Sequence, residues 1–341
     1  MVFSKSHNIN DITIASANPG ANSFDQLPLS WYPVATSHSL KKGQKRALRF
    51  LDKEWLIFRN SNGKLGVISR YCSHMGTDLS NGFVDTKHIV CPLHHWCFDT
   101  NGHCQSDLPQ PFLQQAKLPS LATEESAGVI YVFPSIVASY PLPKLQFNNG
   151  YAISTSATLN LPIHHLFPSM NTFDVAHYGI VHNRKIIGSP VIYSDDDNHL
   201  GIELTAQVIQ KKWQDRIMYI LGLGTVNITI NCWGTTILHM YNVNAKLGAV
   251  VAIAPINESS STLYITAYDT NTASNFITKP LKRLKLELSR LMTIAFLKSD
   301  IPVGRKLKPK EGVLIPGQDD IVKQFWQYYK QLPKIKREDE D

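Results

Sequence analysis

Two cysteines and two histidines stand in a regular arrangement within CSHMGTDLSNGFVDTKHIVCPLHH, residues 72–95. One residue separates Cys72 from His74, and two separate Cys91 from His94. Thiolate and imidazole side chains are the usual ligands of zinc and of iron–sulfur clusters. The stretch therefore predicts a metal site built from two loops.

The distribution of the four ligands favours iron over zinc. Zinc sites usually take both Cys from one loop and both His from another, whereas here each loop supplies one Cys and one His. A [2Fe–2S] cluster with two thiolates on one iron and two imidazoles on the other needs this mixture. Its reduction potential lies at roughly −150 to +300 mV, which suits electron transfer. A structural zinc site is the alternative.

A second group of metal-ligating side chains lies in MNTFDVAHYGIVH, residues 170–182. Asp174 and His177 are three residues apart and would share one face of a helix. His182 follows five residues later, so the helix must break or bend before it, and Gly179 could supply the break. Two His and one carboxylate form the facial triad of non-haem Fe(II) oxygenases. Structural or surface histidines are the alternative.

The elements around the first motif read as short strands and tight turns between residues 30 and 135. A hairpin is expected over 54–70 and a second one, with an Asn-Gly turn, over 96–105. Further short strands are expected at 88–91 and 129–133. The Cys and His would then lie at loop tips of a small all-β unit.

The second motif lies in a region of mixed pattern that follows a Pro- and Asn-rich connection. Residues 167–183 are expected to be helical, and Leu281, Leu284, Leu288, Leu291 and Ala295 form one apolar stripe on a later helix of about five turns. That helix would close a curved antiparallel sheet. The expected strands of the sheet are 200–209, 226–232, 235–243, 248–255 and 262–268.

Length and composition limit the class of protein. The chain has 341 residues, enough for about two domains, and 43% of them are hydrophobic. An odd count of five Cys and an N-terminus without an apolar export segment favour reduced thiols and a cytoplasmic protein. No apolar run is long enough to span a membrane.

The positive charge is concentrated in one segment. The net charge is +7, and residues 279–310 hold ten Lys or Arg against Glu287 and Asp300. No nucleic-acid-binding motif accompanies this charge. An acidic protein partner or a solvated helix face are the two interpretations that remain.

The flanks of both motifs resemble one protein family. Cys72-Ser-His74-Met-Gly76 and Cys91-Pro-Leu-His94-His-Trp96 resemble the two boxes of a Rieske domain. Asn171, Asp174, His177 and His182 resemble the N-x-x-D-x-x-H-x₄-H box of Rieske oxygenase catalytic domains, with Met170 where many members have Glu. The chain thus resembles Rieske-type non-haem iron oxygenases, most closely the monooxygenase branch around aminopyrrolnitrin oxygenase.

The resemblance implies an α+β fold. An N-terminal all-β Rieske [2Fe–2S] domain would be followed by a helix-grip (START-like) catalytic domain with a curved antiparallel sheet and a long C-terminal helix. The implied divisions are an extension at 1–29, the Rieske domain at 30–138, a connection at 139–150, the catalytic mononuclear iron domain at 151–332 and a tail at 333–341.

The resemblance also assigns roles to residues. Cys72, His74, Cys91 and His94 would bind the [2Fe–2S] cluster, while His177 and His182 would bind a mononuclear Fe(II). Asp174 would hydrogen-bond an iron-ligand His and His94 of a neighbouring subunit. The third iron ligand would be Asp300, although Ile301, Pro302 and Gly304 depart from the family context. An acidic residue is electrostatically unfavourable at the end of a helix, which favours a functional reason for Asp300. Glu287 and Asp319 are the other candidates.

The implied activity uses O₂ and electrons from NAD(P)H, delivered by a separate reductase through a ferredoxin and/or flavin partner. The substrate would be a largely apolar, ring-containing small molecule that is hydroxylated, N-oxygenated or desaturated in secondary metabolism or catabolism. Phe173, Trp233, Leu238, Tyr241 and Met292 are candidates for the pocket lining. A homotrimer is expected, with no nucleic-acid and no membrane partner.

Two other functions stay open. A steroid- or sterol-oxidising Rieske monooxygenase would share the same layout. An electron-transfer Rieske protein with an inactive second domain would keep the cluster and lose the second iron.

Overall fold

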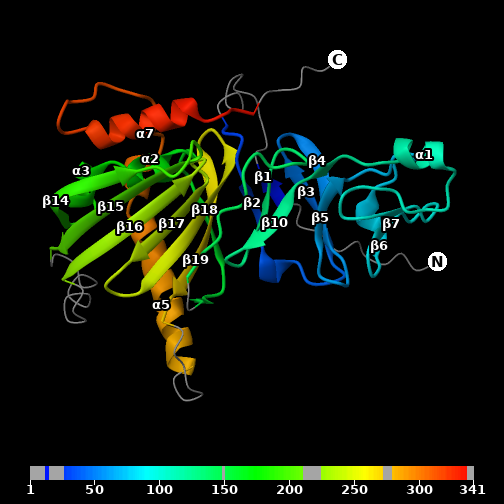
Figure 1. Cartoon of the computed structure of the whole chain (residues 1–341), viewed down its shortest axis with the longest axis horizontal. Helices are drawn as coiled ribbons and strands as arrows, with labels where there is room; N and C mark the ends of the chain where they lie inside the picture. Colours follow the sequence, from blue (N-terminus) through cyan, green and yellow to red (C-terminus); the bar gives the residue numbers. More distant parts are fainter. Residues whose placement is uncertain (1–11, 15–26, 148–149, 210–223, 272–278, 336–341) are drawn as a thin grey trace. The chain divides into compact units, whose positions relative to one another are not determined.

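The computed structural model describes residues 12–14, 27–147, 150–209, 224–271 and 279–335. They fold as two compact units (Figure 1). The first contains Val34–Glu125 and Ile130–Ser139, and the second contains Ser126–Val129, the chain from Tyr140 onwards and the segment that ends at Pro33. One unit is mainly β and the other combines helices with an antiparallel sheet, so the expected α+β class is confirmed.

The first unit is built on short strands, as its pattern predicts. A five-stranded sheet has the order β1-β3-β4-β5-β9, and a three-stranded sheet has the order β6-β7-β8. The hairpin expected over 54–70 is formed by β4 and β5, in antiparallel register. The strands are β1 (Ile12–Ile14), β3 (Lys45–Phe50), β4 (Lys53–Arg59), β5 (Leu65–Ser69), β6 (Phe83–Val84), β7 (Ile89–Val90), β8 (Cys97–Phe98) and β9 (Ser120–Leu121).

A third sheet and three short helical segments complete this part of the chain. The sheet has the order β10-β11-β2. The elements are β2 (Tyr32–Thr36), β10 (Thr123–Ser126), β11 (Val129–Val132), η2 (Ser37–Ser39), η3 (Leu79–Asn81) and α1 (Gln110–Gln115).

The second unit is an eight-stranded antiparallel sheet. Its order is β12-β19-β18-β17-β16-β15-β14, with β13 also paired to β19. The five expected strands are present, and β12, β13 and β14 are additional. The pattern of β14 was hidden by a shift of register between Ile187 and Val191, around Gly188 with φ 72°. The strands are β12 (Ala152–Ile153), β13 (Ala157–Leu161), β14 (Arg184–Tyr193), β15 (His199–Val208), β16 (Thr225–Trp233), β17 (Ile237–Asn242), β18 (Leu247–Asn257) and β19 (Ser260–Asp269).

In the part of the chain that the structure describes, five helices accompany this sheet. The long helix α5 runs along it, on β18 and β19 (Figure 1). The expected helical region is divided into α2 and α3. The helices are α2 (Phe167–Thr172), α3 (Val175–Ile180), α5 (Lys279–Lys298), α6 (Ile301–Gly304) and α7 (Asp320–Gln331).

The leucine stripe of α5 does not face the sheet. Leu281, Leu284, Leu288 and Leu291 are between 51% and 68% exposed. Leu286, about 140° around the helix from Leu281, and Leu297 are buried instead. α5 therefore has apolar side chains on two opposite faces, and periodicity alone does not tell which one meets the sheet.

The ends of the second unit are tied together. The Leu29 amide donates to the Pro333 carbonyl, and the Ile335 amide donates to the Leu27 carbonyl. The Trp31 indole donates to the carbonyl of Tyr140, which joins the expected connection at 139–150 to the same unit. Residues 333–335, expected in a tail, are thus part of the fold; residues 336–341 and most of 1–29 lie outside the described residues.

Candidate metal centres

The loops of the first motif have the same backbone geometry. In each, the Cys amide donates to the carbonyl five residues later, Thr77 for Cys72 and Trp96 for Cys91. In each, the amide four residues later donates back to the Cys carbonyl, and that residue has a positive φ, 69° at Gly76 and 57° at His95. Two turns of one shape therefore present one Cys and one His each.

The four side chains of this motif are brought together. The Cys72 and Cys91 thiols are buried and adjacent, and the His74 and His94 rings, which are exposed, lie 4.7 Å apart between centroids. Trp96 stacks on His74 at 4.5 Å. Two buried Cys and two exposed His fit a cluster with one iron held by sulfur inside and one held by nitrogen at the surface.

Because Cys72 and Cys91 are buried, their thiolate forms need a cation nearby to be stable. Desolvation, together with the neighbouring Cys91 and against opposing main-chain hydrogen bonds, raises the pKa of Cys72 to about 11. Thiolates, which are the ligating form, would therefore require a positive partner such as iron between them.

The other cysteines of this unit differ in their surroundings. Cys97 begins β8 and its thiol donates to the His95 carbonyl, while Cys104 packs in the core with Phe98. Neither lies in one of the two turns.

We expect Cys97→Ser to keep the visible absorption of the cluster, whereas Cys91→Ser should lose it. Loss of absorption in Cys97→Ser alone would contradict the ligand set.

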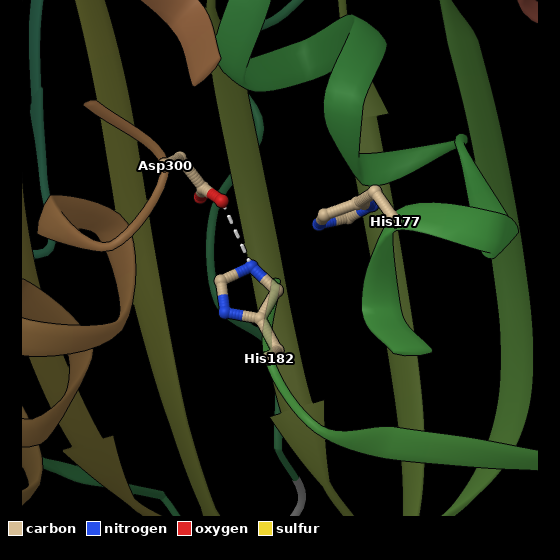
Figure 2. Close-up of side chains that lie close together, drawn as sticks. All are labelled: His177, His182 and Asp300. Atoms are coloured by element: carbon tan, nitrogen blue, oxygen red, sulfur yellow. Dashed lines mark ion pairs between the residues drawn. The ribbon is translucent and has the colours of Figure 1, made fainter. Parts of the chain in front are cut away.

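The second motif forms a compact group with a distant carboxylate. His177 lies in α3, His182 follows that helix, and Asp300 lies between α5 and α6; Figure 2 shows the three side chains pointing toward one another. Their ligand atoms all lie within 4.8 Å of one another, and all three residues are buried. Within the described ranges, no other group of three or more such side chains meets in this way.

The group has the properties of a metal site. His182 Nε2 and Asp300 Oδ1 are 3.0 Å apart. Both atoms are buried, and neither has a hydrogen-bond partner among the described residues, so the pair does not have the geometry of a hydrogen bond. Buried polar atoms are rarely left so. Two ligands about 2.1 Å from one metal ion and at right angles would stand about 3.0 Å apart. The donor set fits iron.

The helix breaks after Ile180 and not at Gly179. α3 continues through Gly179 to Ile180, and Val181 caps it. Asn183, which follows His182, takes a left-handed conformation with φ 53°, which Asn tolerates well. The His182 ring lies 4.9 Å from that of His177.

Asp174 holds His177 through its main chain. The His177 Nδ1 lies 2.5 Å from the Asp174 carbonyl oxygen, so Nδ1–H donates and Nε2 is left for a metal. The Asp174 carboxylate caps α3 by accepting from the Ala176 and His177 amides. Burial lowers the pKa of His177, which favours the neutral, ligating imidazole. The expected contact between the Asp174 carboxylate and an iron-ligand His is thus made by the carbonyl.

A narrow pocket that opens to solvent reaches this group, and His177 and Asp300 are among its lining residues. Its wall is mostly apolar and includes Leu238 and Met240 of β17, Leu263 of β19 and Phe296 of α5, with Asn171 and Thr172 as neutral polar groups.

Of the five expected lining residues, only Leu238 lines this pocket. Tyr241 and Trp233 lie on the opposite face of the sheet, because successive strand residues alternate between faces. Phe173 is buried against Phe325, and Met292 is exposed.

Comparison with known proteins covers both units. Residues 30–120 match the Rieske [2Fe–2S] domain. The chain is 33% identical over 153 residues to chlorophyllide a oxygenase of Arabidopsis thaliana, which covers 45% of this chain and 28% of that protein. It is 30% identical over 131 residues to aminopyrrolnitrin oxygenase PrnD of Pseudomonas fluorescens, covering 36% of each. The chain thus spans about a third of the length of these relatives.

The fold comparison extends over most of the chain. Dicamba monooxygenase with non-heme iron and dicamba superposes with a TM-score of 0.63 over 90% of this chain and 97% of that one, at 14% identity. At this identity the likeness concerns the fold. Among the described residues, no helix combines the length and apolarity of a membrane span. Residues 30–120 are thus a Rieske [2Fe–2S] domain, and the relatives and the shared fold make the chain similar to the Rieske non-haem iron oxygenases.

Proposed function

We propose that the chain is the oxygenase component of a reductase-coupled monooxygenase that oxidises a largely apolar, uncharged small molecule. The observation that carries the proposal is the buried group of His177, His182 and Asp300 beside an apolar pocket, in which His182 Nε2 and Asp300 Oδ1 have no hydrogen-bond partner among the described residues. His177, His182 and Asp300 would hold the iron, which supplies O₂ activation when bound. Cys72, His74, Cys91 and His94 would hold the cluster.

The protein's own contribution is to exclude water and to orient the substrate. The apolar wall of Leu238, Met240, Leu263 and Phe296 favours an apolar molecule, because burying its surface contributes about 25 cal/mol per Å². Apart from His177 and Asp300, the pocket lining carries no ionisable side chain other than the buried Tyr178. A ring-bearing, uncharged substrate therefore fits better than a charged one.

A steroid-type substrate is the second candidate. The oxygenase component of 3-ketosteroid-9-alpha-monooxygenase from Rhodococcus rhodochrous is 25% identical over 183 residues, which covers 50% of this chain and 47% of that protein. An apolar pocket suits this class as well.

The proposal is tested by metal and sulfide analysis of anaerobically purified protein, followed by O₂ uptake with uncharged aromatic and steroid compounds. About three iron and two sulfide per chain are expected for a cluster plus one iron. About two of each, unchanged after incubation with Fe(II), would support an electron carrier with an inactive second domain. Zinc without sulfide would contradict both functions.

The electron donor is proposed to be a ferredoxin or flavin reductase with an acidic surface that binds the basic segment 279–310. Within this segment Lys285 pairs with Asp269 and Lys282 donates to the Asn271 carbonyl, so these two have structural contacts. Lys306 and Lys308 are exposed. We expect Lys306→Glu/Lys308→Glu to raise the KM for an acidic ferredoxin several-fold and to weaken its salt dependence. Unchanged donor kinetics, measured beside the control Lys64→Glu, would exclude this docking surface.

A further inference from the structure

Ser299 stands between the last turn of α5 and Asp300, and its side chain reaches the other iron-ligand candidate. Its Oγ lies 3.2 Å from His182 Nδ1 and 2.6 Å from the Phe296 carbonyl oxygen. We propose that Ser299 is a positioning residue that fixes the tautomer and the orientation of His182 so that Nε2 faces the metal. The inference rests on the proposed iron site and adds a residue to it.

The direction of the two hydrogen bonds follows from their donors. A serine hydroxyl has one hydrogen, and a carbonyl oxygen can only accept. The short contact to the Phe296 carbonyl therefore takes the hydroxyl hydrogen. The Ser299 oxygen must then accept from His182 Nδ1–H. A neutral imidazole carries one N–H, so Nε2 is left with its lone pair directed to the site.

Among the described residues, Ser299 is the one side chain that takes this role for His182. Its side chain is 2% exposed, so bulk water does not replace the hydroxyl. The ring of Phe296 stacks on the imidazole at 3.6 Å and 11°, which fixes the plane of the ring. Nε2 has no hydrogen-bond partner and lies 3.0 Å from Asp300 Oδ1. The ring is thus held from its face and from Nδ1, and only Nε2 is available.

The same short segment therefore serves both ligands. Phe296 and Ser299 orient His182, and the next residue, Asp300, supplies the carboxylate. His177 is held in the same manner, through Nδ1 to the carbonyl of Asp174. Both histidines are thereby set to bind through Nε2. Hydrogen bonds to the second nitrogen of a ligand His typically change metal affinity by about 10- to 100-fold.

The test measures metal affinity without turnover. Protein that keeps its cluster but has lost the mononuclear metal is dialysed against Co(II), and bound cobalt is measured by elemental analysis, which the cluster iron does not disturb. Ser299→Ala is expected to raise the Kd for Co(II) about 10- to 100-fold. Thr293→Ala, which removes a similar hydroxyl-to-carbonyl bond from α5, is the matched control and should bind like wild type.

A second pair of variants separates the hydroxyl from the shape of the side chain. Ser299→Thr and Ser299→Val have nearly the same volume, and only Thr can accept from His182, so Thr should bind Co(II) near the wild-type Kd and Val should bind weakly. Equal affinity of Ser299→Ala and wild type, or equal loss in Thr and Val, would overturn the positioning role. If folded wild-type protein binds no Co(II), the proposed iron site itself fails.

Discussion

Asp300→Asn is expected to remove the mononuclear iron and leave the [2Fe–2S] cluster in place. Iron should fall from about three to about two per chain while sulfide stays at about two. The visible spectrum of the cluster should not change, and O₂ uptake coupled to product formation should be lost. Elemental analysis and an oxygen electrode measure both effects on one preparation.

The physical reason is the chemistry of the buried carboxylate. Asp300 is 7% exposed, and its Oδ1 has no hydrogen-bond partner although it lies 3.0 Å from His182 Nε2. An amide has nearly the same size but carries no charge and is a weak ligand for iron. Because the amide removes a buried negative charge, the metal-free variant should be at least as stable as metal-free wild type. Loss of iron would then not be a result of unfolding.

The thermal stability of the folded protein should also show whether the mononuclear iron site is lost. At a free Fe(II) concentration of 100 times Kd, binding stabilises the folded wild type by about 2.7 kcal/mol. This increase in Tm should be absent from Asp300→Asn. The other acidic candidates are the matched controls: Glu287 accepts from the Thr155 amide and Asp319 from the Ile315 amide, both at the surface. Glu287→Gln and Asp319→Asn should keep iron. Retention of iron by Asp300→Asn would remove it from the ligand set.

The sequence could predict those parts of the site that are formed by residues close together in the chain. The two cluster loops are short and self-contained, so their spacing was sufficient to propose the ligands, and the left-handed Gly76 is visible as a glycine. The left-handed conformation of His95 is not visible in the sequence, because this equivalent position carries a side chain and is not a glycine. The pair His177 and His182 is local as well, although the helix between them breaks after Ile180 and not at Gly179.

The parts of the site that lie far from His182 in the sequence could be identified only once the fold was known. Nothing in the residues near His182 identifies Asp300 over Glu287 or Asp319, because the choice depends on where α5 ends. Periodicity predicted α5 itself but not that Leu286 and Leu297, rather than the leucine stripe, face the sheet. In the same way, one step along β17 separates Met240, which lines the pocket, from Tyr241, which does not. Ser299 had no signal in the sequence.

Asp174→Asn is expected to leave both metals in place and to lower product formation by about a hundredfold. Asn caps a helix as well as Asp does, so the amide oxygen can still accept from the Ala176 and His177 amides. The main-chain carbonyl that holds His177 is not altered. The substitution therefore removes one negative charge at the start of α3 while the geometry of the iron ligand is kept.

The expected result separates two steps. If the carboxylate connects the iron site with a cluster in a neighbouring subunit, as we propose, the rate of cluster reduction by dithionite or donor should be that of wild type. Product formed in a single turnover from pre-reduced protein should then fall. Asp320→Asn is the control, because it removes an acidic charge from the first turn of α7 and leaves the metal ligands untouched. Wild-type turnover of Asp174→Asn, or an equal loss in Asp320→Asn, would show that the carboxylate acts only as a helix cap and that the electrons reach the iron without it.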